Sequence, residues 1–354
     1  MGSYCSCSIP NRLNNDIIIP NHSLNDKIIP STNNYINEKQ NKNDGNMTRF
    51  KTYNTNTNPN IKQNQLEKKK NDISPERERE RNTFISSSSN LIQHKIISTS
   101  KISQDIMKKF YSLYKPLNDS IHVEDVKLAY GESIEYNGEW NKLKGERHGR
   151  GILLINKKRL FLGYWKNDKM NGFGKQINFE KNVENLNDID IFSENKSYSY
   201  FIGEYKDNYR EGKGKEFWLD GTLFEGDYKL GQKNGEGILT LPDGSIYKGQ
   251  FKDGKVSGKG KIVYSDKREY EGEWSNNKFQ GKGIFIWPDG RKYTGEYFNN
   301  LKDGYGTFEW PNGRKYKGKW TKGRQNSEGE IYDPVTDKWH SGKWYMGEKI
   351  KSIV

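Results

Sequence analysis

The chain has 354 residues, a formal net charge of +13 and only 31% hydrophobic residues, so one conventional core cannot extend along its whole length. The positive charge is diffuse, and no RNP motif, zinc-finger spacing or concentrated basic helix accompanies it, which argues against nucleic-acid binding. No apolar run approaches the ~18 residues of a transmembrane helix, and no secretion signal is present, so we expect a cytosolic protein.

The first residues match a lipidation pattern. Gly2 and Ser6 fit M-G-x-x-x-[ST], in which the glycine exposed by removal of the initiator methionine accepts a myristoyl group. Cys5 and Cys7, the only cysteines, are candidate palmitoylation sites; the alternative is that both thiols stay unmodified and have no role. A single myristoyl chain binds membranes weakly, with a partition constant of about 10⁴ M⁻¹, so stable attachment needs a second signal such as thioacylation. We therefore expect residues 1–10 to be an acylated anchor that places the protein peripherally on the cytoplasmic face of the plasma membrane or of a cortical internal membrane.

Residues 11–97 are rich in Asn, Lys and Ser, whereas all nine tryptophans lie from Trp140 onward. A segment of this composition cannot bury enough apolar surface to offset the entropy lost on ordering. We therefore predict a disordered tether between the anchor and the rest of the chain.

Residues 98–130 are predicted to hold one short amphipathic helix and an N-terminal cap of the following region. Apolar residues recur there at helical spacing, at Ile102, Ile106, Phe110, Leu113 and Leu117. Ser100 is the expected N-cap and Pro116 the expected end, which gives a helix over residues 101–115. The helix is expected to cap the first edge of a sheet, and the alternative is that it lies on a membrane.

From residue 136 the chain repeats itself. Five consecutive intervals between unit starts are 23 residues long, and an insertion of about 17 residues between positions 180 and 197 lengthens an earlier interval. A truncated ninth unit surrounds His340 and Trp344. The eight fuller units open at Tyr136, Phe161, Phe201, Phe224, Tyr247, Tyr270, Tyr293 and Tyr316.

Each unit is predicted to be one β-hairpin. In the pattern Y-x-G-x-W, the alternation with period two places Tyr270, Gly272 and Trp274 on one face of a strand. A second alternating strand of the form G-x-G-x-I-x-W follows, and a Pro-Asp-Gly turn closes the unit. Glycine beside aromatic residues indicates that neighbouring rings cover the bare backbone.

This pattern resembles the MORN repeat (membrane occupation and recognition nexus) from residue 136 to residue 347. The resemblance implies an all-β fold, an elongated single-layer antiparallel β-meander of tandem MORN hairpins over residues 131–349, with about 17 strands and an aromatic-lined groove. Asp168, Asn208, Asn277 and Asn300 replace a usual glycine, and we expect a positive φ at each. The predicted structural residues of the repeat face are Tyr247, Gly249, Phe251, Tyr270, Gly272, Trp274, Tyr293, Gly295, Tyr297, Tyr316, Gly318 and Trp320.

No catalytic signature is present, and the five histidines are scattered without carboxylates or cysteines at ligand spacing. We therefore expect neither an enzyme nor a metal or cofactor site. The preferred function is a membrane-tethered scaffold that binds protein partners through the aromatic groove, and the resemblance points to a cortical or submembrane cytoskeleton.

The alternative function is a lipid reader. In that reading the repeats contact anionic phosphoinositide headgroups directly through a set of lysines, namely Lys248, Lys259, Lys261, Lys292 and Lys317. We also expect a homodimer through the C-terminal repeats, because the strand near Trp344 would leave an unpaired edge.

Overall fold

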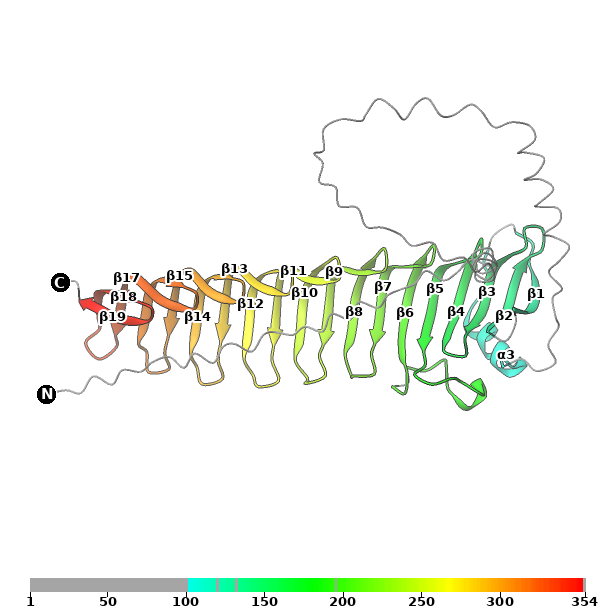
Figure 1. Ribbon diagram of the computed structural model, residues 1–354, viewed down its shortest axis with the longest axis horizontal. Helices are drawn as coiled ribbons and strands as arrows, with labels where there is room; N and C mark the ends of the chain where they lie inside the picture. The colour runs from blue at the N-terminus through cyan, green and yellow to red at the C-terminus, as the bar shows by residue number, and fades with distance from the viewer. Residues whose placement is uncertain (1–100, 119–120, 131–132, 195, 353–354) are drawn as a thin grey trace, which may run out of the picture.

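One antiparallel sheet forms most of the described chain. The computed structural model describes residues 101–118, 121–130, 133–194 and 196–352. Within them, 19 strands follow one another in chain order, and each pairs antiparallel with the next. The sheet is an open, elongated meander (Figure 1), which confirms the predicted fold class. The predicted anchor and tether lie outside the described residues.

The bounds of the elements follow the repeat frame. The first elements are α3 (Gln104–Leu113), β1 (Glu124–Tyr130), β2 (Ile134–Asn141), β3 (Glu146–Ile155), β4 (Arg159–Lys166), β5 (Lys169–Asn178) and the 3₁₀ turn η1 (Leu186–Asp188). The middle strands are β6 (Ser199–Lys206), β7 (Tyr209–Phe217), β8 (Leu223–Lys229), β9 (Gln232–Thr240), β10 (Ile246–Lys252), β11 (Lys255–Val263) and β12 (Glu269–Ser275). The last strands are β13 (Lys278–Ile286), β14 (Lys292–Phe298), β15 (Leu301–Glu309), β16 (Lys315–Thr321), β17 (Arg324–Asp333), β18 (Lys338–Tyr345) and β19 (Glu348–Ser352).

Each repeat unit forms one hairpin, as predicted. In the unit that opens at Tyr270, β12 pairs with β13 so that Gly272 lies opposite Gly283. A register shift between Gly272 and Trp274 marks a β-bulge, and the same shift recurs in the neighbouring units. Because a bulge bends its strand and increases the local twist, its repetition returns equivalent side chains to equivalent places every two strands.

The turn positions that lack glycine adopt the predicted backbone. The φ angles of Asp168, Asn208, Asn277 and Asn300 are 67°, 72°, 66° and 69°, so the expected positive φ is confirmed at each. The side chains also join adjacent units. The Oδ1 atom of Asn277, for example, accepts a hydrogen bond of 2.8 Å from the main-chain N–H of Val256 in the preceding unit.

The predicted helix is present but shorter than expected. Its N-cap is Ser103, whose side chain accepts a hydrogen bond from the first turn, and not Ser100, which lies outside the described residues. The helix ends at Leu113, because the chain turns extended before Pro116. Leu113 and Leu117 are consequently exposed and do not continue the buried stripe.

The helix α3 covers a face of the sheet and not its edge, which corrects the predicted capping role. Phe110 packs with Ile152 and Leu154 of β3, whereas Leu153 and Ile155 of the same strand point to the opposite face. The first edge is formed by β1, an additional strand that the repeat frame did not predict. The sheet is therefore buried on both faces at this end, and the continuous apolar run of β3 is typical of such a strand.

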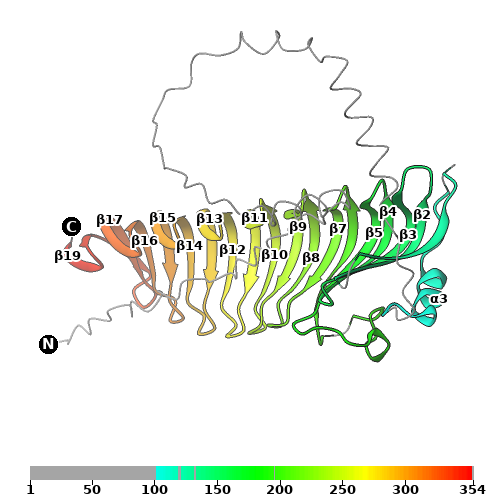
Figure 2. The same ribbon diagram turned by 45° about the vertical axis from the view of Figure 1, so that its right-hand side comes forward.

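The loop of residues 179–198, called the insertion below, completes this second layer. Val183, Leu186 and Ile191 are buried in the same cluster as α3. Figure 2 shows α3 and the insertion on the same side of the sheet. The strands β5 and β6 pair directly, with Gly174 opposite Gly203, so the insertion leaves the stacking of units intact as predicted.

The C-terminal unit differs from the prediction. It is a complete hairpin and not a truncated unit, because Trp344 of β18 lies opposite Lys349 of β19. The strand near Trp344 is therefore not the free edge; that edge is β19, whose residues are all exposed. The two additional strands, β1 and β19, account for 19 strands in place of about 17. Lys349 and Lys351 lie on this edge, and edge lysines oppose pairing with another chain.

Candidate functional site

The predicted repeat residues of β10, β12, β14 and β16 form the aromatic face of the sheet. The opening tyrosines and the following aromatic residues are almost fully buried: Tyr270 is 0% exposed and Trp274 is 3% exposed. The ring of Tyr270 meets those of Trp274 and Tyr297 edge-on, at centroid distances of 5.2 and 5.3 Å. The rings therefore fill this face themselves, and the described residues provide no open aromatic groove of the kind expected from the sequence.

The glycines allow the rings to lie on the backbone. A Cβ atom at Gly272 would lie 2.5 Å from the Cα atom of Gly283 and 2.7 Å from the Oη atom of Tyr270. The hydroxyl of Tyr270 in turn donates a 2.8 Å hydrogen bond to the main-chain oxygen of Glu273. Burial raises the pKa of the opening tyrosines, to about 12 for Tyr316.

The tenth position of each unit after the first, and its equivalent Arg147 in the first unit, faces the rings and was missed at the level of sequence. It lies opposite the second aromatic residue across the hairpin, as Phe279 lies opposite Trp274. Its identity varies more than that of the ring positions, and several of its occupants are cations. The occupants from the first unit to the ninth are Arg147, Met170, Arg210, Lys233, Val256, Phe279, Lys302, Gln325 and Lys349. The sequence signal is the residue nine positions after the opening residue of a unit, or eleven positions after it in the first unit, whose loop is two residues longer.

The buried cations at this position are stabilised in two ways. Arg210 pairs with Glu216 at 2.7 Å and lies 4.4 Å from the ring centre of Phe201. Lys302 has no carboxylate within ion-pairing distance among the described residues, and its ammonium lies 4.5 Å from the ring centre of Trp320 and 4.9 Å from that of Phe308. Burial lowers the pKa of Lys302 to about 7.

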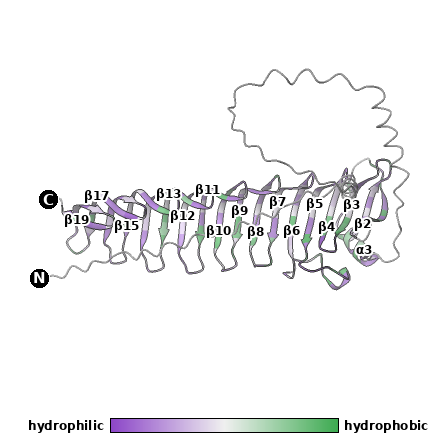
Figure 3. Ribbon diagram, in the orientation of Figure 1, coloured by the Kyte–Doolittle hydropathy of each residue, from purple (hydrophilic) through white to green (hydrophobic). Residues whose placement is uncertain are grey.

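The opposite face of the array, called the polar face, carries a hollow of about 850 Å³ that extends from β9 to β15. Charged residues alternate with aromatic and glycine residues along these strands, so the charged side chains project here. Figure 3 shows hydrophilic and hydrophobic stretches mixed along the same strands. Lysines and glutamates line the hollow in equal number, and glycine backbone is also exposed in it. The charged lining residues are Lys248, Lys259, Lys261, Lys282, Glu236, Glu271, Glu273 and Glu296.

The five lysines proposed to read lipids differ in their surroundings. Lys261 lies 2.8 Å from Glu269, and this hydrogen bond raises its pKa. Lys292 lies 3.2 Å from Glu309. Lys248, Lys259 and Lys317 are exposed, and no carboxylate lies within 4 Å of their ammonium groups among the described residues.

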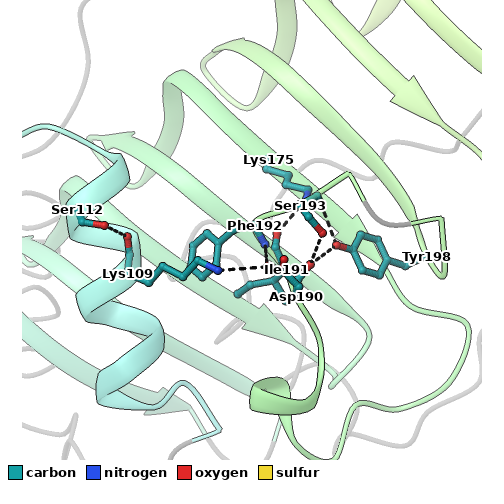
Figure 4. Close-up of polar contacts among 8 residues, drawn as sticks. All are labelled: Lys109, Ser112, Lys175, Asp190, Ile191, Phe192, Ser193 and Tyr198. Atoms are coloured by element: carbon teal, nitrogen blue, oxygen red, sulfur yellow. Dashed lines mark hydrogen bonds and ion pairs between the residues drawn. The ribbon is translucent and has the colours of Figure 1, made fainter.

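A second candidate site lies between α3 and the insertion. Figure 4 shows Lys109 of α3 reaching Asp190 of the insertion, at 3.4 Å, and Lys175 of β5 turned toward the same loop. The ammonium of Lys175 donates to the main-chain oxygens of Ile191 and Ser193, at 2.9 and 2.5 Å. Burial lowers the pKa of Lys175 to about 8.

An apolar slot of about 330 Å³, called the slot below, remains open beside these contacts. Leu113 at the end of α3 and its C-cap residue Tyr114 form one wall, Phe173 of β5 forms part of the floor, and Phe192 of the insertion forms the opposite wall. Leu113 is 58% exposed and Phe173 is 49% exposed, so apolar surface faces solvent at the mouth.

The predicted lipidation residues Gly2, Cys5 and Cys7 lie outside the described residues. No helix in the part of the chain that the structure describes is long and apolar enough to cross a membrane. In the same residues, His, Cys, Asp and Glu side chains form no group of three that could hold a metal ion.

Comparison with known proteins identifies the repeats. The family model of the MORN repeat matches residues 161–177, 201–223, 224–246, 247–267, 270–290 and 293–313, and each match begins at a unit start named above. The chain therefore carries MORN repeats at six places. No curated protein matches the chain.

Solved structures show only distant likeness. The SAS-4 (dCPAP) TCP domain of Drosophila melanogaster, in complex with a proline-rich motif of Ana2 (dSTIL), is 14% identical, with a TM-score of 0.27 over 57% of this chain and 92% of that chain. The wild-type TCP10 domain of Danio rerio CPAP is 10% identical, with a TM-score of 0.27 over 68% of this chain and 99% of that chain. These scores are too low to carry an argument about this chain.

Proposed function

We propose that this chain is a membrane-tethered, non-enzymatic scaffold that organises protein partners at a cortical or submembrane cytoskeletal structure. Its MORN repeats support a repeat-based binding scaffold. The motif of Gly2, Ser6, Cys5 and Cys7 supports attachment to a membrane by myristoyl and palmitoyl chains.

The observation that carries the proposal is the hollow on the polar face. The aromatic face is filled by its own rings, so a partner of the array meets the polar face. The hollow offers exposed glycine backbone together with four lysines and four glutamates. A lining of both signs suits an extended peptide that carries both charges, whereas a phosphoinositide headgroup requires a cluster of one sign. The partner is therefore a protein segment and not the bilayer.

A lipid-reading function is the second candidate, because Lys248, Lys259 and Lys282 line the hollow without a carboxylate within 4 Å among the described residues. These three ammonium groups are the part of the hollow that an anionic headgroup would contact first.

Site-specific crosslinking separates the two functions. A photo-crosslinking amino acid in place of Tyr305, which lines the hollow and is 68% exposed, should capture a protein in cells. The same replacement of Leu143, an exposed turn residue between β2 and β3, should not.

Flotation with phosphoinositide-containing liposomes at physiological salt gives the opposing test. The full chain made in bacteria, without acyl groups, should not float. Selective flotation that is lost in a variant with Lys248, Lys259 and Lys282 replaced by glutamate would establish the lipid reader and reject the scaffold.

Self-association is a separate proposal. The exposed edge strand β19 is available for pairing with a second copy by two-fold symmetry, although Lys349 and Lys351 oppose it. Light scattering of the unacylated full chain tests it, and a strictly monomeric chain would reject edge pairing without affecting the scaffold.

A further inference from the structure

The polar face changes character near α3. Phe173 is the thirteenth residue of the second unit. In the six units that follow, the thirteenth position is occupied by Lys213, Glu236, Lys259, Lys282, Tyr305 and Glu328. Leu162 of β4 and Ile202 of β6 likewise present apolar side chains beside Phe173. Apolar side chains from three neighbouring strands therefore adjoin where α3 and the insertion approach the polar face, and part of this apolar surface stays uncovered in the slot.

The shape of the slot is fixed by packing. The ring of Tyr114 packs against that of Phe110 at a centroid distance of 4.6 Å and against that of Tyr164 at 5.6 Å. The hydroxyl of Tyr164 donates to the main-chain oxygen of Lys115 at 2.8 Å, which holds the end of α3 against β4. The slot is thus formed by restrained side chains, and its volume is at the lower end of the ~300–1,000 Å³ of small-molecule sites.

The chemistry of the slot selects a hydrocarbon. The ammonium of Lys175, the one ionisable cation among the described lining residues, is engaged by the main-chain oxygens of Ile191 and Ser193. The rings of Tyr198 and Tyr200 lie 5.4 and 5.2 Å from the same ammonium. The cation is thus held by its own surroundings, so the slot offers apolar area and no free charge for an anionic headgroup.

We propose that the slot binds the myristoyl chain on Gly2 of the same molecule. This inference rests on the acylation that the proposed function includes. Gly2 precedes the first described residue by 99 positions, and at up to ~3.3 Å per residue the length of the chain does not limit its reach to the slot. The tether also makes this occupant intramolecular, so it competes at a high effective concentration with any free ligand.

A docked chain would control membrane attachment. One myristoyl chain binds a bilayer weakly, so a slot that holds it tenfold better than solvent lowers the apparent partition constant by about tenfold. Thioacylation of Cys5 and Cys7 adds chains that the small slot cannot also hold, which commits the protein to the membrane. The slot would thus keep the singly acylated protein off membranes until the second acylation.

The test uses the full chain co-expressed with an N-myristoyltransferase and vesicles of zwitterionic lipid alone. Phe173→Lys places in the slot a residue that other units carry at the same position. This variant should partition onto the vesicles about tenfold more strongly than the wild type. Glu328→Lys places a lysine at the equivalent position of β17, outside the hollow and far from the slot, and should leave partitioning unchanged. Leu113→Ser, at an exposed helix end, provides a second slot variant with little risk to folding.

A spectroscopic readout is independent of partitioning. The terminal methyl group of ¹³C-labelled myristate should show a ring-current shift in the wild type, because Tyr114, Phe173 and Phe192 surround the slot, and should lose that shift in both slot variants. A myristoylated wild type without the shift, or slot variants that partition like the wild type, would overturn the slot inference and leave the anchor standing. A chain whose mass shows no myristoylation would overturn the anchor and the slot together.

Discussion

The contact between the two central glycines of each hairpin provides the sharpest test of the fold. Gly272→Ala would place a Cβ atom 2.5 Å from the Cα atom of Gly283, 2.6 Å from the main-chain oxygen of Lys282 and 2.7 Å from the Oη atom of Tyr270. Two of these three atoms are backbone atoms of the paired strand, so they cannot rotate away. Overpacking of this kind costs about 1–3 kcal/mol, and we expect the upper end because the strands themselves must separate.

The matched control is Gly254→Ala in the turn between β10 and β11. Gly254 has a φ of +78°, and a Cβ atom there would meet nothing within 4 Å. Its substitution therefore carries only the cost of a left-handed backbone, about 1–2 kcal/mol. Gly272→Ala therefore measures the steric cost of an added Cβ atom, whereas Gly254→Ala measures the conformational cost of a side chain at a positive φ.

Hydrogen exchange is the suitable assay, because an array of units need not unfold in one step. A difference of about 1–2 kcal/mol corresponds to about 5- to 30-fold faster exchange of the β12 and β13 amides in Gly272→Ala than of the amides flanking position 254 in Gly254→Ala, each relative to the wild type. Equal acceleration in the two variants, or a smaller one in Gly272→Ala, would refute the assignment of ring-covered glycine contacts.

Three further predictions concern charge and attachment. Lys302 has a folded pKa of about 7, below its unfolded value, so the unfolded state binds more protons between pH 7 and 10, and stability should rise with pH by about 2–4 kcal/mol. Urea unfolding should show a smaller rise in Lys302→Met, in which the lowered pKa of Lys175 still contributes, and an equal rise in both proteins would contradict the assignment. Glu216→Gln should destabilise the chain by about 3–5 kcal/mol, because it removes the carboxylate that pairs with the buried Arg210. Adding Arg210→Met to this variant should recover much of the lost stability. A thermal melt that shows no recovery would reject the ion pair as the cause. Gly2→Ala should release the protein from membranes in fractionation, whereas replacing both N-terminal cysteines by serine should leave weak binding; full retention of Gly2→Ala would reject the anchor.

The repeat units were predictable because their signals are local. The alternation of Tyr270, Gly272 and Trp274 places three residues on one face whatever surrounds them, and the fixed period of 23 residues repeats that placement. The positive φ at Asn277 was predictable for the same reason, since a short polar side chain tolerates that backbone in a turn.

The second layer was less predictable because it depends on segments far apart in the sequence. The pairing of α3 with the insertion joins residues such as Lys109 and Asp190, and nothing in the spacing of either segment indicates the other. The one available signal was the continuous apolar run in β3, which indicates a strand buried on both faces.

The sequence by itself determined the hairpin unit, the order of the units and the face that each ring occupies, because a period of two along a strand and a period of 23 along the chain are properties of local geometry. Only the tertiary structure decided that the rings fill their own face, that the hollow lies on the polar face and that α3 leaves the slot beside Phe173. These features depend on how closely side chains from different units approach one another, and close packing is settled by distances in space that a linear pattern does not contain.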